Sequence, residues 1–67
     1  MSIVLNGKNV VLPEEVTSIQ RLLTHYDLEN RIVVVELNKE IILKEQYETM
    51  NLSHGDRVEI IHFVGGG

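Results

Sequence analysis

The chain of 67 residues has no cysteine, and it contains only three aromatic residues and one proline. Without cysteine, no disulfide bond can stabilise the fold, and no thiolate can bind a metal ion or attack a substrate. Three aromatic side chains are too few for a platform on which nucleic-acid bases stack. These absences argue against a disulfide-stabilised domain, a thiol enzyme and a protein that binds single-stranded nucleic acid.

Long apolar runs and clusters of basic residues are absent as well. No segment is long and apolar enough to span a membrane, and Met1-Ser2-Ile3-Val4 lacks the basic region that opens a signal peptide. The six lysine and arginine residues are scattered, and the formal net charge is −4, which argues against a nucleic-acid partner. We expect a cytoplasmic protein that binds neither nucleic acid nor a membrane. Its mildly acidic surface would suit a partner with a basic docking surface.

Apolar alternation and turn signals predict the order β-β-α-β-β-β. The expected strands cover residues 2–5, 8–12, 31–37, 40–43 and 57–62, with a helix from residue 17 to residue 26 and a single helical turn around 45–47. Asn6-Gly7 between two apolar runs predicts a type I′ hairpin turn, because both residues tolerate positive φ. Thr17 is the predicted N-cap of the helix, with Gln20 completing a capping box.

Only one helix is available to cover the sheet, so we expect an α+β domain with the helix packed on one face. Alternation along the last strand turns Val58 and Ile60 toward the helix. The same side is expected for Ile3, Leu5, Val33 and Val35. Ile61, Val34 and Ile32 then lie on the face without a helix. Because exposed aliphatic clusters tend to mark interfaces, we interpret these three residues as a candidate docking surface for a partner.

The sequence ends in Phe63-Val64-Gly65-Gly66-Gly67. A run of glycine has no side-chain bulk and reaches backbone conformations that are closed to other residues. At about 3.3–3.6 Å per residue, the five residues reach roughly 17 Å, enough to thread a narrow channel in another protein. Such an ending can present the carboxylate of Gly67 to the catalytic groups of another protein, with Phe63, Val64, Gly65 and Gly66 as the tail that the partner recognises. On its own, the ending more often marks a loose terminus or a remnant of cloning.

Three segments carry a resemblance to known proteins: Leu5-Asn6-Gly7, residues 35–42 and residues 55–67 with their triglycine end. Together with the short length, they resemble the β-grasp fold of ubiquitin-like proteins and, more closely, the ThiS family of sulfur carriers in bacterial thiamine biosynthesis. The resemblance covers essentially the whole chain. It implies the sheet order 2-1-5-3-4, a β-grasp domain over residues 1–62 and a flexible carrier tail over residues 63–67.

The resemblance also implies a chemistry that the main-chain terminus carries. An E1-like adenylyltransferase of the ThiF type would use ATP to join AMP to the carboxylate of Gly67, which is otherwise a poor electrophile. Sulfur from a persulfide, supplied by a donor such as a cysteine-desulfurase system, would displace AMP and leave a thiocarboxylate. A thiazole synthase of the ThiG type would take that sulfur into the thiazole of thiamine. The carrier would be a protein co-substrate rather than an enzyme, with no bound cofactor.

The residues themselves argue against a metal site and an internal active site. His25, His54 and His62 are spaced unlike any compact ligand motif, so no metal site is expected. A fold of this size also leaves little room for a catalytic pocket. Two alternatives stay open: a carrier or conjugated modifier that serves another product such as molybdopterin, and a non-covalent β-grasp adaptor whose glycines are inert.

Overall fold

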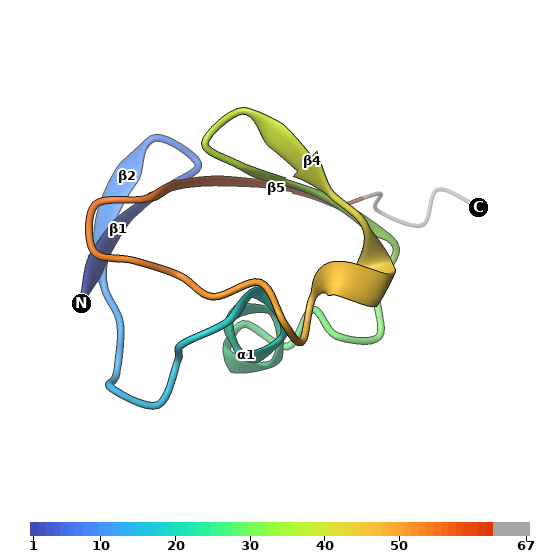
Figure 1. The fold of residues 1–67 in the computed structure, drawn as a ribbon, viewed down its shortest axis with the longest axis horizontal. Helices are drawn as coiled ribbons and strands as arrows, with labels where there is room; N and C mark the ends of the chain where they lie inside the picture. The colour runs from blue at the N-terminus through green and yellow to red at the C-terminus, as the bar shows by residue number, and fades with distance from the viewer. Residues whose placement is uncertain (63–67) are drawn as a thin grey trace.

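A computed structural model of the chain describes residues 1–62. The elements, in chain order, are β1 (Ser2–Leu5), β2 (Lys8–Val11), α1 (Ile19–His25), β3 (Val33–Leu37), β4 (Glu40–Ile42), the 3₁₀ turn η1 (Lys44–Gln46) and β5 (Arg57–His62). The five strands form one sheet in the order β2-β1-β5-β3-β4, and the sheet arches over α1 (Figure 1). The α+β class and the sheet order that the resemblance implied are both confirmed.

The last strand, β5, occupies the centre of this sheet. It runs parallel to β1, with Val4 opposite Arg57 and Leu5 opposite Val58. On its other side it runs antiparallel to β3 through five residue pairs, from Val33 opposite His62 to Leu37 opposite Val58. The first and last strands of the chain are therefore neighbours, and β5 is hydrogen-bonded on both edges.

Two tight turns build the hairpins that flank β5. Asn6 and Gly7 both have positive φ, 49° and 83°, as the predicted type I′ turn requires. Asn38 and Lys39, between β3 and β4, also have positive φ, 51° and 72°. Asparagine tolerates this region because its short polar side chain bonds locally, so each hairpin begins its turn with a residue suited to it.

The core lies between α1 and the covered face of the sheet. The buried hydrophobic residues are Ile3, Leu12, Val16, Ile19, Leu22, Leu23, Val35, Ile42, Tyr47, Leu52, Val58 and Ile60. Leu5, Val33 and Leu28 pack against this cluster and are partly buried. The predicted inward face of the sheet is thus confirmed. Tyr26, the last residue of the predicted helix, lies one residue beyond the observed helix, which ends at His25, and is 39% exposed.

The prediction that Thr17 caps the helix is wrong. Ser18 is the N-cap, and its hydroxyl oxygen accepts a hydrogen bond of 3.1 Å from the backbone N–H of Arg21. A contact distant in sequence decides the position: Ser18 forms an isolated antiparallel bridge with Asn51, and Leu52 N–H donates to the Thr17 carbonyl oxygen at 2.9 Å. This pairing keeps the backbone extended through Ser18, so the helix cannot begin one residue earlier.

The segment between β4 and β5 closes one side of the core. Its 3₁₀ turn lies within one residue of the helical turn expected around 45–47. Gln20 N–H donates to the Tyr47 carbonyl oxygen at 2.9 Å, which ties the segment to the start of α1.

Three strands are shorter than predicted, since β2 ends at Val11, β3 begins at Val33 and β4 ends at Ile42. No helix in residues 1–62 is long and apolar enough to cross a membrane.

The cap assignment leads to a direct prediction. Ser18→Ala removes the side-chain acceptor for the Arg21 N–H and should lower the free energy of unfolding by about 1 kcal/mol. Thr17→Ala, the matched control, deletes a hydroxyl from an exposed residue and should change it by less than half as much. Urea denaturation of both variants measures the difference. An equal or larger loss in Thr17→Ala would contradict the assignment.

Candidate functional site

The predicted site has two parts, of which the structure describes one. Phe63, Val64, Gly65, Gly66 and Gly67, predicted as tail and reactive end, lie outside the described residues. The strand β5 ends at His62, directly before them in the sequence. The structure therefore describes the strand that precedes these residues in the sequence and the surface near the end of that strand.

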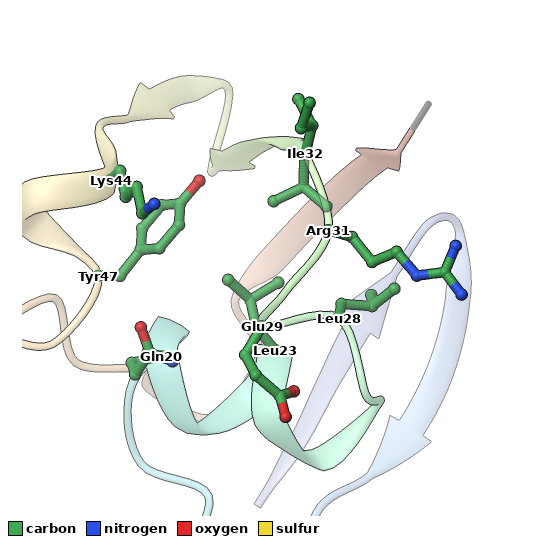
Figure 2. A pocket seen from close by; sticks show the side chains of 9 residues that line it. Gln20, Leu23, Leu28, Glu29, Arg31, Ile32, Lys44 and Tyr47 are labelled. Carbon is green, nitrogen blue, oxygen red and sulfur yellow. The ribbon is translucent and has the colours of Figure 1, made fainter. Parts of the chain in front are cut away.

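The three predicted docking residues lie on the uncovered face of the sheet. Val34 and Ile61 are directly opposite each other on β3 and β5, and Ile61 is 53% exposed. Ile32, just before β3, is 77% exposed, and its side chain projects away from α1 (Figure 2). The structure therefore brings these residues together near the end of β5, as expected. Their role in docking stays a prediction.

Ile41 belongs to the same face, although it is not among the predicted docking residues. It lies opposite Glu36 in the β3–β4 ladder and is 63% exposed, whereas the next residue, Ile42, is buried. Alternation within Glu40-Ile41-Ile42 would have placed Ile41 outward once Ile42 was known to be inward. Three residues are too few to decide which of the two faces the core. We call Ile32, Val34, Ile41 and Ile61 the outer apolar patch.

Two carboxylates adjoin the outer apolar patch. Glu36 on β3 and Glu59 on β5 are directly opposite each other, each two residues from a member of the patch, Val34 or Ile61. Directly opposed side chains on antiparallel strands have Cβ atoms about 4.5–5.5 Å apart, and like charges there are destabilising. Repulsion between the two carboxylates therefore lowers the stability of the fold. The same two carboxylates place negative charge beside the exposed apolar residues.

The asparagines of the two hairpin turns bind β5 from opposite sides. Asn6 N–H donates to the Val58 carbonyl oxygen at 2.9 Å, and its side chain accepts from Ile60 N–H at 2.8 Å and donates to the Ile60 carbonyl oxygen at 3.3 Å. Asn38 N–H donates to the Arg57 carbonyl oxygen at 2.8 Å, and its side chain accepts from Arg57 N–H at 3.0 Å. The two turns therefore anchor β5 near its end and at its start, respectively.

A hollow opens between α1, the start of β3 and η1. It is lined by Gln20, Leu23, Leu28, Glu29, Arg31, Ile32, Val33, Lys44 and Tyr47. In Figure 2 the Arg31 guanidinium and the Glu29 carboxylate point away from the Tyr47 ring. Desolvation by burial raises the pKa of the Tyr47 hydroxyl above its usual value. The charged groups diverge, unlike the convergent polar groups of a typical ligand site.

The three histidines occupy separate places. His25 lies in the last turn of α1, where a cation would complement the helix dipole, and its ring meets that of Tyr26 edge to face at 5.0 Å. His54 Nδ1 accepts a hydrogen bond from Ser2 N–H at 3.1 Å. His62 pairs with Val33 at the end of β5. Across residues 1–62, no three histidine, aspartate or glutamate side chains are grouped as metal ligands.

Comparison with solved structures supports the same fold. The crystal structure of a thiamine biosynthesis protein, ThiS, from Geobacter metallireducens superposes with a TM-score of 0.83 and is 30% identical in sequence, with all of both chains covered. A solution structure of a thiamine biosynthesis protein from the same organism gives the same TM-score and identity, over all of this chain and 88% of that one.

Comparison with known sequences assigns the family. The chain is 56% identical to the sulfur carrier protein ThiS of Bacillus subtilis (strain 168) over 63 residues, which cover 94% of this chain and 96% of that protein. It is 36% identical over its whole length to a thiazole synthase of Paramagnetospirillum magneticum, of which it spans 20%. The model of the ThiS family matches residues 3–67. With a match of this extent and relatives at this identity, the chain belongs to the ThiS family.

Proposed function

We propose that this chain, a sulfur carrier of the ThiS family, carries sulfur on the carboxylate of Gly67 for the synthesis of the thiazole of thiamine. The observation that carries the proposal is the family match, which extends through residue 67 and so includes the triglycine segment. The β-grasp body supports it as well, because its central strand ends at His62, three residues before Gly65 in the sequence.

The proposed chemistry needs a main-chain carboxylate and no catalytic side chain of the carrier. A carboxylate oxygen of Gly67 attacks the α-phosphate of ATP, pyrophosphate leaves, and the resulting mixed anhydride has AMP as a good leaving group. Sulfur of a persulfide then displaces AMP, and a thiol cleaves the sulfur–sulfur bond to leave a thiocarboxylate. Glycine suits both steps because it has no Cβ that would shield the carbonyl carbon or crowd the adenylate.

The proposal implies three partners. An E1-like adenylyltransferase of the ThiF type activates the carboxylate, a cysteine-desulfurase system supplies the persulfide, and a thiazole synthase of the ThiG type accepts the sulfur. Similarity of the entire chain to a fifth of a protein named thiazole synthase supports the last of these, since a segment like this one occurs within that protein. Because the activating step consumes ATP, the proposal places the carrier in the cytoplasm.

The decisive experiment measures the mass of the intact chain. After incubation with an E1-like enzyme, ATP and a persulfide donor, the mass should rise by the difference between one sulfur and one oxygen atom. Omitting ATP is the control and should leave the mass unchanged. An unchanged mass in the full mixture would favour a non-covalent adaptor and contradict the proposal. Addition of a thiazole synthase and its other substrates should then return the mass to its starting value.

The length of the terminal segment should be critical. Deleting Gly67, or adding one residue after it, moves the carboxylate by roughly 3.3–3.6 Å, farther than a tightly fitted reaction centre tolerates. We predict that both variants lose adenylation, measured as ATP–pyrophosphate exchange with the activating enzyme, while their unfolding midpoints do not change. One glycine added before Met1 is the control and should retain activity. Normal exchange by the shortened or lengthened chain would contradict the prediction.

We propose that the outer apolar patch docks the activating enzyme. Ile61→Asp places a charge in the middle of that patch and should weaken binding at least tenfold, about 1.4 kcal/mol. The side chain is 53% exposed, so the folded domain should persist. Val11→Asp is the matched control, because Val11 is 81% exposed on the distant edge strand β2. Calorimetric titration distinguishes the two variants. Equal affinity in Ile61→Asp and the unsubstituted chain would rule the patch out.

The opposed carboxylates beside the patch lead to a prediction in which stability and binding change in opposite directions. Glu36→Gln relieves the repulsion with Glu59 and should raise the free energy of unfolding by about 0.2–1 kcal/mol. If a basic side chain of the activating enzyme contacts both carboxylates, the same substitution should weaken binding and reduce its dependence on salt. Urea denaturation and titration at two salt concentrations measure these effects.

The control for this pair is Glu40→Gln. Glu40 lies opposite Leu37, so the substitution makes the same charge change without touching the opposed carboxylates. It should leave both stability and salt dependence close to those of the unsubstituted chain. A Glu36→Gln variant that binds as well as the control would show that the carboxylates do not take part in docking.

A further inference from the structure

We infer that Asn6 is a positioning residue for the carrier reaction: its side chain fixes the direction in which β5 delivers the terminal segment. The inference rests on the proposed function. Its basis is the bidentate contact between the Asn6 side-chain amide and Ile60, 54 residues away in the sequence. Ile60 is two residues before the end of β5, which makes this contact the last one on the β1 side of the strand in the described part of the chain.

The amide continues the β1–β5 ladder where the main chain of β1 cannot. The ladder pairs Val4 with Arg57 and Leu5 with Val58, and Asn6 N–H still reaches the Val58 carbonyl oxygen at 2.9 Å. At Asn6 the backbone turns with φ of 49° and leaves the sheet. Its side chain then offers one acceptor and one donor, as a peptide group does, and these meet the N–H and C=O of Ile60 at 2.8 and 3.3 Å.

The contact determines whether the end of β5 is supported on one edge or on two. On the β3 side, Ile60, Ile61 and His62 pair with Val35, Val34 and Val33. On the β1 side of these three residues, the hydrogen bonds found within residues 1–62 are those from Asn6. Without them, the end of β5 would be joined to the sheet along one edge only and could tilt about β3. Any tilt there displaces the attachment point of the residues that follow His62.

The surroundings of Asn6 agree with this role. A shallow hollow beside the end of β5 is lined by Leu5, Asn6, Tyr26, Leu28, Ile60 and His62. The amide therefore lies at the same recess as His62, the residue that precedes the terminal segment. The outer apolar patch is on the opposite face of the sheet, so a change at Asn6 leaves the proposed docking surface intact. A substitution at Asn6 can therefore change the direction of the end of β5 without changing how the partner binds.

Asn38 supplies a matched control within the same molecule. It also begins a two-residue turn with positive φ, 51° against 49° for Asn6. Its backbone N–H also donates to a β5 carbonyl oxygen, and its side-chain oxygen also accepts from a β5 N–H, at 3.0 Å. The main difference is position: Asn38 binds Arg57, the first residue of β5, and Asn6 binds Ile60 near its end. The side-chain amide of Asn38 also donates to Asp56 Oδ1 at 3.1 Å, just before β5, where that of Asn6 donates to the Ile60 carbonyl oxygen.

Asn6→Gly and Asn38→Gly form the test, because glycine keeps the positive φ free of strain and removes only the side-chain hydrogen bonds. Both variants should unfold at similar, slightly lowered urea concentrations. With the activating enzyme, Asn6→Gly should lower kcat for thiocarboxylate formation about tenfold, within the ~100-fold that a 1 Å misplacement can cost, and leave KM unchanged. Asn38→Gly should keep the kcat of the unsubstituted chain.

Two further measurements separate positioning from a general loss of stability. The amide hydrogen of Ile60 should exchange faster in Asn6→Gly than in Asn38→Gly, since its acceptor has been removed. Asn6→Asp keeps an oxygen that accepts from the Ile60 N–H and loses the donor to the Ile60 carbonyl, so its kcat should lie between those of Asn6→Gly and the unsubstituted chain. Both results are expected if the side-chain amide of Asn6 orients the end of β5.

Three outcomes would overturn the inference, and they are distinguishable. An equal fall of kcat in both glycine variants would show a merely structural role. Faster amide exchange at Ile60 with an unaltered kcat would show that the reaction does not depend on how the end of β5 is oriented. Failure of the unsubstituted chain to form a thiocarboxylate would refute the proposed function and this inference with it, and the first two outcomes leave the proposed function standing.

Discussion

Hydrogen bonding of β5 on both of its edges is the constraint on which the rest of this structure depends. The strand lies between β1, the first strand of the chain, and β3, so the last described element lies in the interior of the sheet. Val58 and Ile60 extend from it into the core under α1. A segment that begins where such a strand ends has a fixed origin, whatever its own conformation. If sulfur is carried on the carboxylate of Gly67, as we propose, this fixed origin limits where that carboxylate can reach.

The two faces of the sheet differ in burial and in charge. One face is covered by α1 and packs on the hydrophobic core of residues 1–62, which a domain this small needs in order to fold at all. The other face leaves Ile32, Ile41 and Ile61 exposed and places Glu36 against Glu59. Departures from ideal packing of this kind are expected at functional surfaces. If this face docks a partner, as we propose, stability and recognition depend on different residues of the same strands.

Local signals in the sequence predicted most of the fold, and the misses have a common physical cause. Asn6-Gly7 marked a hairpin because both φ values must be positive, and alternation correctly oriented Val58, Ile60 and Ile61. The helix N-cap was misplaced from Ser18 to Thr17 because a bridge to Asn51, 33 residues away, decides it. The sheet order followed only from the resemblance, since periodicity contains no information on which strands are neighbours. The Asn6–Ile60 contact spans 54 residues and left no local signal.

The central claim is that sulfur is carried at the carbonyl carbon of Gly67, with the described domain as its support. Fragmentation of the activated chain in a mass spectrometer tests this most directly, because it assigns the mass increase to particular residues. The account predicts that every C-terminal fragment containing Gly67 gains the mass difference between sulfur and oxygen, and that fragments ending before Gly67 gain nothing. An increase located on a side chain within residues 1–66, or no increase in any fragment, would contradict it.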